Sequence, residues 1–445
     1  MLNRVVLFEY SEKRIDELDV QFTQRDFDRI ENFNDKIRAL KRLGTNVLEV
    51  VYSQGRPKSL KTTSFVGVIP IGNWTIEILP KTAKDVDKDE TRRQAVRNLL
   101  YMLCFTIKLT VKEVDVSTLH KVDDDFFEVL IYLYAKNLID AIARNLSKNY
   151  INRKENLTFL KGKLNFSEHI TRNTVFAHRF FAQFDEFSED NLLNRILKYT
   201  THLLLHRSRN FENVKLLQQL AFMLDDVSFT RIGLSDFKRV HLTRLNEEYA
   251  PILNLCKLFI SQSSVELSAD EMATFSFIFD MNVLFEEFIG EFIKREFQGE
   301  YSSIRLQPAD KFLVDEKIVG HVRQGSVFRM RPDIILQKGG GDSAGRLILD
   351  TKYKRLGGLD NKEGVSQSDL YQMHAYSKKY DCPSVVMLYP QTSKESKRFD
   401  FCIDSFTVVH IRTVNLCRDL RADKEGLHNE LAEILKARDF VDSAS

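Results

Sequence analysis

The hydrophobic pattern of this chain changes twice along its 445 residues. Short strand-like runs separated by Gly and Pro fill the first part to about Lys81, interrupted by one helical pattern over Gln24–Ile37. Long runs with helical spacing follow, and the last third mixes both patterns. A chain of this length normally forms more than one domain, so the pattern predicts an α/β protein of the multidomain α+β kind.

Two polar stretches mark these changes of pattern. KTAKDVDKDETRR begins at Lys81, and SQSSVELSADE begins at Ser261. We therefore predict a β-rich N-terminal module over residues 1–90, a mainly helical domain over residues 91–262 and a mixed domain over residues 263–445. In the mixed domain we expect a helix, three strands, a second helix and further strands, in that order.

Composition excludes some classes of protein but names no ligand. Lys and Arg number 65 against 63 Asp and Glu, so the net charge of +2 neither favours nor excludes a polyanionic partner. The five cysteines are odd in number and lack zinc-ligand spacing, which predicts reduced core thiols. No stretch approaches about eighteen uninterrupted apolar residues, so we expect a soluble cytoplasmic protein with no membrane partner.

The segment VFRMRPDIILQKGGGDSAGRLILDTKYKRL predicts two strands joined by a Gly-rich turn at residues 339–345. Side chains alternate across a strand, so Asp333 shares a face with Ile335, while Met330 lies on the other face. On the second strand, Asp350 and Lys352 share a face. The pattern therefore brings two carboxylates to neighbouring strands, with a lysine beside the second.

Two carboxylates held together repel each other unless a cation lies between them, and hard oxygen ligands suit Mg²⁺ or Mn²⁺. Lys352 points into the same place, where it can orient or help deprotonate an attacking water and balance phosphate charge. These residue types in this order predict a metal site for phosphodiester hydrolysis, with Asp333 and Asp350 as ligands.

The Asp-x-Lys spacing alone is weak evidence. In the alternative reading, Asp333 and Asp350 are ordinary strand-end carboxylates, in water or in salt bridges with Arg331 and Lys354. The apolar run before Asp350 and the proline before Asp333 favour the metal site. The same spacing also occurs by chance at Asp236-Phe237-Lys238, Asp315-Glu316-Lys317, Asp360-Asn361-Lys362 and Glu395-Ser396-Lys397.

Two predicted helices carry polar residues that suit the same site. In SQSDLYQMHAYSKKY, capped at Ser366 or Ser368, Gln372 and Tyr376 lie one turn apart, although an ordinary amphipathic helix would also place them so. In MNVLFEEFIGEFIKREF, Glu286 lies at the edge of the apolar stripe, whereas the next residue is flanked by charges. Glu286 is therefore either a third metal ligand or an interfacial surface glutamate.

The sequence also resembles a known family. RPD followed by LILDTKYK resembles the PD-(D/E)xK nuclease signature, and Gln372-x-x-x-Tyr376 resembles the QxxxY helix of its RecB-like branch. More narrowly, five blocks resemble the McrC family, the endonuclease subunits of McrBC-type modification-dependent restriction systems, and occur in that family's order. They are VVLFEY at Val5–Tyr10, IEILPK at Ile76–Lys81, KGKLNF at Lys161–Phe166, FDEFSEDNLLNRI at Phe184–Ile196 and MNVLFEEF at Met281–Phe288.

The resemblance implies a metal-dependent endonuclease that cuts double-stranded DNA. The domain over residues 263–445 would then have the restriction-endonuclease-like fold, a central mixed sheet flanked by helices. Dimerisation of complexes would allow both strands to be cut. The implied catalytic residues are Asp333, Asp350, Lys352, Gln372, Glu286 and Tyr376, of which Asp333, Asp350 and Glu286 are the implied metal ligands.

The resemblance further implies a partner, a hexameric AAA+ GTPase of the McrB kind, docked by the first two predicted domains. That partner would bind the GTP, because this chain has no G-x-x-x-x-G-K-[ST] motif, and its nearest match at Gly340–Gly345 lacks the lysine. The run Phe184–Asn194 either contacts the partner, or its acidic residues cap a helix or form a hinge in the core of their own domain. Two other functions stay open: a stand-alone RecB-like repair nuclease, and a GTPase-activating subunit with secondary nuclease activity.

Overall fold

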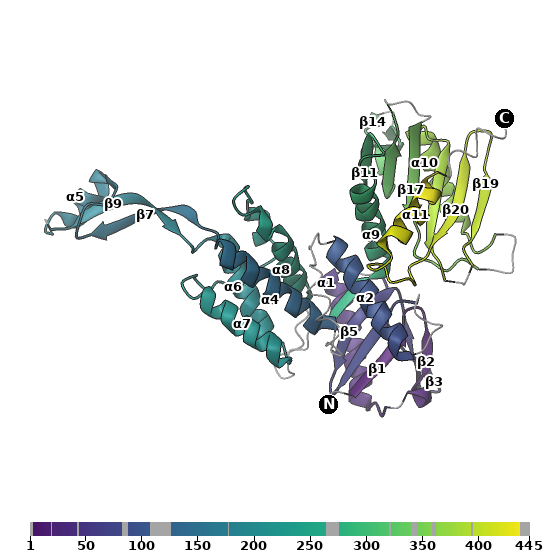
Figure 1. Cartoon of the computed structure of the whole chain (residues 1–445), viewed down its shortest axis with the longest axis horizontal. Coiled ribbons are helices and arrows are strands. Elements are labelled where there is room, and N and C mark those ends of the chain that lie inside the picture. Colours follow the sequence, from purple (N-terminus) through teal and green to yellow (C-terminus); the bar gives the residue numbers. More distant parts are fainter. Residues whose placement is uncertain are drawn as a thin grey trace. The chain divides into compact units, whose positions relative to one another are not determined.

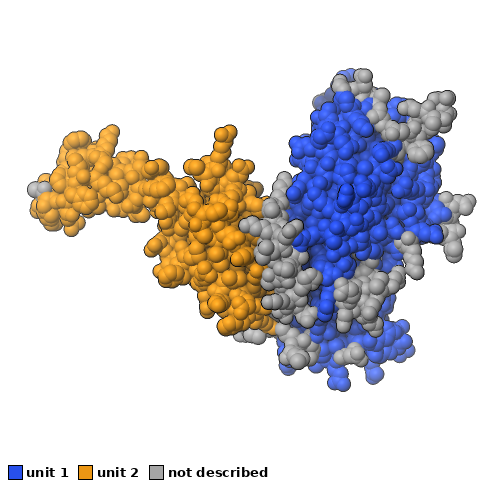
Figure 2. All heavy atoms as spheres, in the orientation of Figure 1, with its two compact units in different colours: residues 1–108, 267–445 blue, residues 109–266 orange. Residues whose placement is uncertain are grey.

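The computed structural model divides the chain into two compact units (Figure 1, Figure 2). Unit 1 contains residues 1–108 and 267–445, and unit 2 contains residues 109–266. Unit 2 is therefore an insertion in the sequence of unit 1. The structure describes residues 3–18, 20–41, 44–81, 88–106, 126–176, 178–263, 276–319, 322–339, 345–357, 362–392 and 395–436.

The first sheet of unit 1 takes its strands from both parts of that unit. In spatial order they are β1 (Asn3–Phe8), β6 (Trp74–Leu79), β5 (Phe65–Ile71) and β10 (Phe277–Asp280). β1 runs parallel to β6, and the other two pairs are antiparallel. Gly67 on β5 has φ +129°, and a Cβ there would lie 1.9 Å from the carbonyl oxygen of Phe277. Glycine is therefore what allows β10 to approach β5.

A smaller antiparallel sheet and one helix complete the N-terminal part of unit 1. They are β2 (Glu12–Arg14), β4 (Arg56–Thr62), β3 (Leu48–Ser53) and α1 (Gln24–Lys41), with a 3₁₀ turn, η1 (Ile15–Glu17). The helix predicted over Gln24–Ile37 is confirmed and extends to Lys41. Its buried apolar side chains, Phe27, Ile30, Phe33 and Ile37, follow helical spacing.

A six-stranded mixed sheet forms the core of the last third. In spatial order its strands are β11 (Ser303–Leu306), β16 (Ile334–Gln337), β17 (Arg346–Thr351), β18 (Ser384–Pro390), β20 (Val408–Val414) and β19 (Arg398–Cys402). β17, β18 and β20 are parallel, and the remaining neighbours are antiparallel. Every residue of β18 is buried, because parallel strands in the middle of a sheet are covered on both faces.

Four helices of unit 1 surround the predicted site or support it. They are α2 (Lys88–Thr106), α9 (Met281–Glu296), α10 (Gln367–Tyr380) and α11 (Lys424–Leu435). On α10, Met373, Tyr376 and Tyr380 pack in one core cluster with residues of β16, β17, β18 and β20. The rings of Tyr101 and Phe105 on α2 contact α9 at centroid distances of 5.5–6.0 Å. α2 therefore packs within unit 1.

The strand predicted through Met330 and Asp333 is broken at that point. Two short hairpin pairs precede β16: β12 (Phe312–Val314) with β15 (Val327–Arg329), and β13 (Lys317–Val319) with β14 (Val322–Gln324). Pro332 has no N–H to donate to a sheet, so β15 ends before it and β16 begins after it. Met330 packs with Ile335, so the prediction that they face opposite ways is wrong. The described part of the chain has seven strands between α9 and α10 instead of three.

Unit 2 is a bundle of helices from which a hairpin projects (Figure 1). The helices predicted from spacing are present as α4 (Phe126–Arg144), α6 (Leu192–Leu205), α7 (Phe211–Met223) and α8 (Ala250–Ser263), with 3₁₀ turns η3 (Asp236–Arg239) and η4 (Glu247–Tyr249). The hairpin, which helical periodicity does not predict, contains β7 (Asn149–Leu157), β8 (Lys163–Leu164), α5 (Phe166–Asn173) and β9 (Phe180–Ser188). We call it the arm.

The run Phe184–Asn194 completes β9 and then caps α6. The side chain of Asn191 accepts a hydrogen bond from the backbone N of Asn194 at 3.0 Å, as an N-cap does. The run therefore does cap a helix, through Asn191 and not through an acidic residue, while the core hinge and the partner contact stay predictions. The predicted boundary between residues 90 and 91 falls within α2, and the one between residues 262 and 263 falls in the last turn of α8. The three-domain division with its docking roles stays a prediction. None of the described helices is long and apolar enough to cross a membrane.

The close approach at Gly67 yields a stability test. Gly67→Ala places a methyl group against the Phe277 carbonyl and strains a positive φ, so we expect a loss of about 2–4 kcal/mol in the free energy of unfolding. Chemical denaturation measures it. Gly299→Ala is the control, because nothing lies within 4 Å of a Cβ there. Equal losses in both variants would contradict the close approach.

Candidate functional site

The site begins where β16 and β17 lie side by side. Ile334 on β16 pairs with Leu349 on β17, so Asp333 and Asp350 lie at the same end of adjacent antiparallel strands. Asp350 is only 2% exposed, because β17 lies between β16 and β18 in the middle of the sheet. The backbone N of Lys352 donates to the carbonyl oxygen of Leu388 at 2.8 Å and holds the chain beyond the strand. The sequence prediction that the two carboxylates come together is confirmed.

Lys352 lies between the second carboxylate and helix α10. Its Nζ is 2.5 Å from Asp350 Oδ2 and donates to Gln372 Oε1 at 3.1 Å. Gln372 Nε2 in turn donates to the Tyr376 hydroxyl at 2.9 Å, and that hydroxyl donates to the Arg331 carbonyl oxygen at 3.1 Å. Ser366 caps α10, by accepting from the N of the residue three positions on. The predicted lysine, glutamine and tyrosine therefore form one connected series.

Asp333 is held by the strand that carries Asp350. Its Oδ2 accepts hydrogen bonds from the backbone N and the hydroxyl of Thr351, at 2.6 and 2.7 Å. The salt bridges of the alternative reading are absent among the described contacts: Arg331 donates to Gln307, and Lys354 pairs with another carboxylate. Burial raises the pKa of Asp333 above its usual value although the Thr351 hydrogen bonds lower it.

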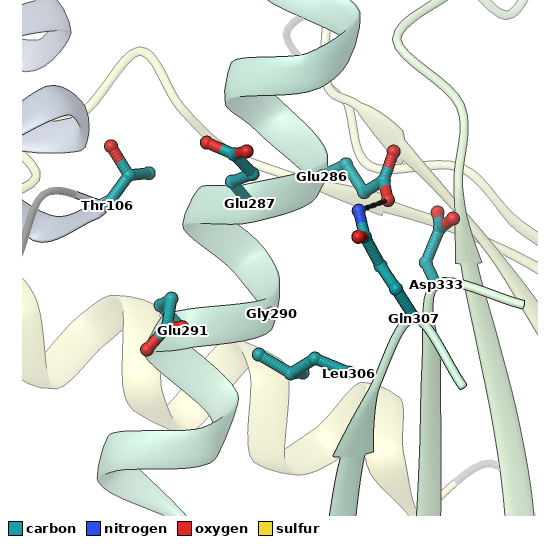
Figure 3. A pocket seen from close by; sticks show the side chains of 8 residues that line it. All are labelled: Thr106, Glu286, Glu287, Gly290, Glu291, Leu306, Gln307 and Asp333. Carbon is teal, nitrogen blue, oxygen red and sulfur yellow. Dashed lines mark hydrogen bonds between the residues drawn. The ribbon is translucent and has the colours of Figure 1, made fainter. Parts of the chain in front are cut away.

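Glu286 reaches the site from α9. Figure 3 shows its carboxylate and that of Asp333 turned toward one another in a cavity of about 230 Å³ that both residues line. Gln307 donates a hydrogen bond to Glu286 and accepts one from Arg331. Glu286 is half-buried and Glu287 exposed, which is the orientation that helical spacing predicts. Burial, and then the negative charge of Asp333, raise the pKa of Glu286.

The three carboxylates and the lysine influence one another's ionisation. Burial, and then the charge of Asp333, raise the pKa of Asp350 to about 7, against the attraction of Lys352. Burial acts to lower the pKa of Lys352, but the attraction of the surrounding carboxylates, Asp350 first, outweighs it and raises that pKa. The site therefore concentrates negative charge that protons or cations must balance.

The donor set suits a hard divalent cation. Asp350 Oδ2 is buried and, apart from the Lys352 ion pair, accepts no hydrogen bond from the described residues. Glu286, Asp333 and Asp350 supply the oxygen ligands that Mg²⁺ and Mn²⁺ prefer. Within the described part of the chain, no three His, Cys, Asp or Glu side chains are grouped closely enough to hold a metal ion as they stand. The metal-binding role of these carboxylates stays a prediction.

Two further residues of this site are not predicted from the sequence. Thr351 holds Asp333, and Gln307 links Glu286 to Arg331. Strand alternation alone would turn the Thr351 side chain away from Asp350. Gln307 follows a short strand far from the motif and carries no spacing signal. Both depend on contacts between segments that only the folded chain brings together.

Comparison with known proteins places the chain in a family. The family model described as McrBC 5-methylcytosine restriction system component matches residues 60–390, about three quarters of the chain. The chain belongs to this family. The resemblance to McrC is therefore confirmed, and the chain is a component of an McrBC-type restriction system.

Relatives in this family are distant in sequence. A protein of Escherichia coli (strain K12), described as type IV methyl-directed restriction enzyme EcoKMcrBC, is 23% identical over 292 residues, 63% of this chain and 80% of that protein. A chain of a Thermococcus gammatolerans assembly of McrB AAA+ hexamers with bound McrC has the same fold, with a TM-score of 0.66 and 24% identity, covering 95% of this chain and 100% of that one. A chain of the T. gammatolerans McrBC complex covers 66% of this chain and 88% of its own length, with a TM-score of 0.53 and 27% identity.

The raised pKa of Asp350 predicts a pH dependence. The folded chain holds this proton more tightly than the unfolded chain, so ionisation of Asp350 costs stability as the pH rises between 3.8 and about 7. Asp350→Asn cannot ionise. In metal-free buffer, the free energy of unfolding of Asp350→Asn minus that of the wild type should therefore increase from pH 3.8 to about 7. Above that range the difference should be constant. Urea denaturation at several pH values measures the difference.

Asp369→Asn is a control of opposite sign. Burial acts to raise the pKa of Asp369, but hydrogen bonds from Ser366 and Lys354 outweigh it and lower that pKa. The ionised side chain therefore stabilises the fold, and this variant should lose stability relative to the wild type as the pH rises through the range where unfolded Asp ionises. Equal pH trends in the two variants would contradict the charge distribution described here.

Proposed function

We propose that this chain is the endonuclease subunit of a GTP-dependent, modification-dependent restriction complex. One observation carries the proposal: Glu286, Asp333 and Asp350 meet at one end of a buried sheet, with Lys352 beside them. Phosphodiester hydrolysis needs an attacking water, a means to deprotonate it and positive charge near the phosphate. Three carboxylates and an ammonium group are a suitable set for that chemistry.

Each residue would have a distinct part. Glu286, Asp333 and Asp350 would hold Mg²⁺ or Mn²⁺, which supplies charge neutralisation and a lowered pKa for bound water. Lys352 would orient the attacking water and balance charge on the phosphate, at a position set by Asp350 and Gln372. Tyr376 would support Gln372 through their hydrogen bond, and Thr351 would keep Asp333 turned toward Asp350. The two last roles act through neighbours and not on substrate.

The substrate and the fold type follow from the same proposal. The order of helix α9, antiparallel β16 and β17, and helix α10 is the order expected for a PD-(D/E)xK domain, here with a mixed six-stranded sheet. Double-stranded DNA is the substrate expected of a restriction component. The Thermococcus assembly contains McrB AAA+ hexamers with bound McrC, which supports a hexameric AAA+ protein as partner of this chain. In our proposal this partner is the GTPase and binds the GTP.

Asp350→Ala tests the nuclease part. With the AAA+ partner, GTP, Mg²⁺ and modified DNA, we expect cleavage to fall by about 100-fold or more, because the site loses a ligand and the partner of Lys352. Stimulation of GTP hydrolysis should remain. Gel analysis of cleaved DNA and phosphate release measure the two activities separately.

Asp315→Ala is a matched control, since Asp315 belongs to another Asp-x-Lys triplet and its side chain is 82% exposed. It should cut DNA as the wild type does. Full cleavage by Asp350→Ala would remove Asp350 from the reaction. Full cleavage by the isolated wild-type chain, without partner or GTP, would instead favour the stand-alone repair nuclease.

The arm is a suitable docking element for the partner. It is a thin hairpin, so its large apolar side chains have little core to fill. Exposed apolar side chains gathered on one element usually mark a protein interface. In the arm, the exposed side chains are Tyr150, Phe159, Leu160, Phe166, Ile170, Val175, Phe176 and Phe187. We include the arm in the proposal as a contact with the AAA+ ring.

Phe166 and Ile170 lie one turn apart on α5 and are 68% and 67% exposed. Replacing both with Ser should reduce stimulation of the partner's GTP hydrolysis by about 10-fold or more, because buried apolar anchors dominate interface energies. The midpoint of thermal unfolding should not change. Phe222→Ser on α7, where Phe222 is 82% exposed, is the control outside the arm. Unchanged stimulation in the double variant would exclude this face of the arm from docking.

A further inference from the structure

A buried charged pair lies at one edge of the first sheet of unit 1. β1 and β6 are parallel, so they end at the same edge, where Glu9 and Lys81 follow them. Glu9 N donates to the Leu79 carbonyl oxygen at 2.8 Å, and Lys81 N donates to Glu9 Oε1 at 2.8 Å. Glu9 is 0% exposed and Lys81 3%. The edge of this sheet therefore presents a carboxylate and an ammonium group with no access to water.

Both groups hold one residue of the distant Asp-Thr-Lys-Tyr segment. The Tyr353 hydroxyl donates to Glu9 Oε1 at 2.6 Å, while Lys81 Nζ donates to the Tyr353 carbonyl oxygen at 3.0 Å. Lys81 Nζ also lies 3.7 Å from the centroid of the Tyr353 ring, in a cation–π contact. The side chain and the backbone of Tyr353 are thus fixed from the same side. We call Glu9, Lys81 and Tyr353 the edge cluster.

Tyr353 directly follows Lys352, beyond the end of β17. The chain turns tightly here, since Lys354 N donates to the Lys352 carbonyl oxygen at 2.8 Å. The Tyr353 ring contacts that of Phe285 at a centroid distance of 5.4 Å, and Phe285 precedes Glu286 on α9. Tyr353 is therefore bonded to Lys352 along the chain and packs against the residue that precedes Glu286.

We propose that Glu9 and Lys81 are positioning residues for the nuclease site. They fix Tyr353, and through it the backbone of Lys352, so that the lysine ammonium lies between Asp350 and Gln372. The N-terminal sheet is then a working part of the nuclease and not only a docking module. This inference rests on the proposed nuclease function.

The chemistry of the edge cluster suits residues that fix the orientation of Tyr353 better than residues that only join the two segments. Buried charged groups stabilise a fold less well than apolar side chains of similar size, because each charge loses its water. Burial raises the pKa of Glu9 to about 7, and its Oε2 accepts no hydrogen bond from the described residues. Apolar packing would join the two segments at lower cost. Hydrogen bonds to both ends of Tyr353, by contrast, fix its orientation.

Two mild variants and their combination test the proposal. Tyr353→Phe removes one hydroxyl and keeps the ring, and Glu9→Gln keeps the shape of the side chain and removes its charge. With partner, GTP and Mg²⁺ present, each should lower kcat for DNA cleavage by about 10- to 100-fold, with KM for DNA unchanged. The double variant should lose no more than the weaker-cutting single variant, since the two residues act as one unit. Stimulation of GTP hydrolysis should stay at the wild-type level.

Glu77→Gln is the matched control, because Glu77 on β6 of the same sheet is also a buried glutamate, here in an ion pair with Arg92. It should lower the midpoint of thermal unfolding without a selective loss of cleavage. The proposal is overturned if both single variants cut DNA at the wild-type rate, or if their losses add and affect GTP hydrolysis equally. Asp350→Ala in the same assay distinguishes failure of the positioning proposal from failure of the proposed nuclease function. If that variant also cuts normally, the nuclease function itself is contradicted.

Discussion

The contact between Lys352 and Asp350 is the constraint on which the rest of the site depends. The strand that carries Asp350 is buried, so its carboxylate has almost no water to stabilise its charge. A nearby ammonium group, a proton or a metal ion must supply that stabilisation, and in a buried site each interacts strongly. In the structure, the ammonium group of Lys352 is the cation that supplies it. Gln372 and Tyr376 help to fix the position of the Lys352 ammonium group beside Asp350 through their hydrogen bonds.

The last third of the chain does not form this site alone. β10 joins the first sheet, and the aromatic rings of α2 pack against α9, the helix that carries Glu286. The edge cluster adds hydrogen bonds from that sheet to Tyr353. Segments separated by the whole of unit 2 in sequence thus share one core. The segments that carry the site residues are therefore supported by both parts of unit 1.

Sequence reasoning succeeded where the signal is local. Alternation and helical spacing suffice for Asp350, Lys352 and the turn from Gln372 to Tyr376, because these residues are neighbours along one element. It failed where the strand is interrupted and where distant segments decide. Pro332 breaks the strand before Asp333, so Met330 lies in the same core cluster as Ile335. Strand β7 of the arm has polar residues on both faces, so its sequence shows no apolar face from which a strand could be predicted. Thr351 and Gln307 bond to residues of other segments, and the sequence pattern around them does not indicate these contacts.

The pairing of β10 with β5 has a consequence for how the chain is made. A ribosome completes β1, β5 and β6 long before it reaches Phe277, and it synthesises the whole of unit 2 in between. Until then the β5 edge that carries Gly67 has unpaired backbone groups, and α2 has no α9 to cover. Unit 2 can reach its helical core from a continuous stretch of chain, whereas unit 1 must wait for a contact of high sequence separation. Unit 2 is thus expected to fold before the core of unit 1 is complete.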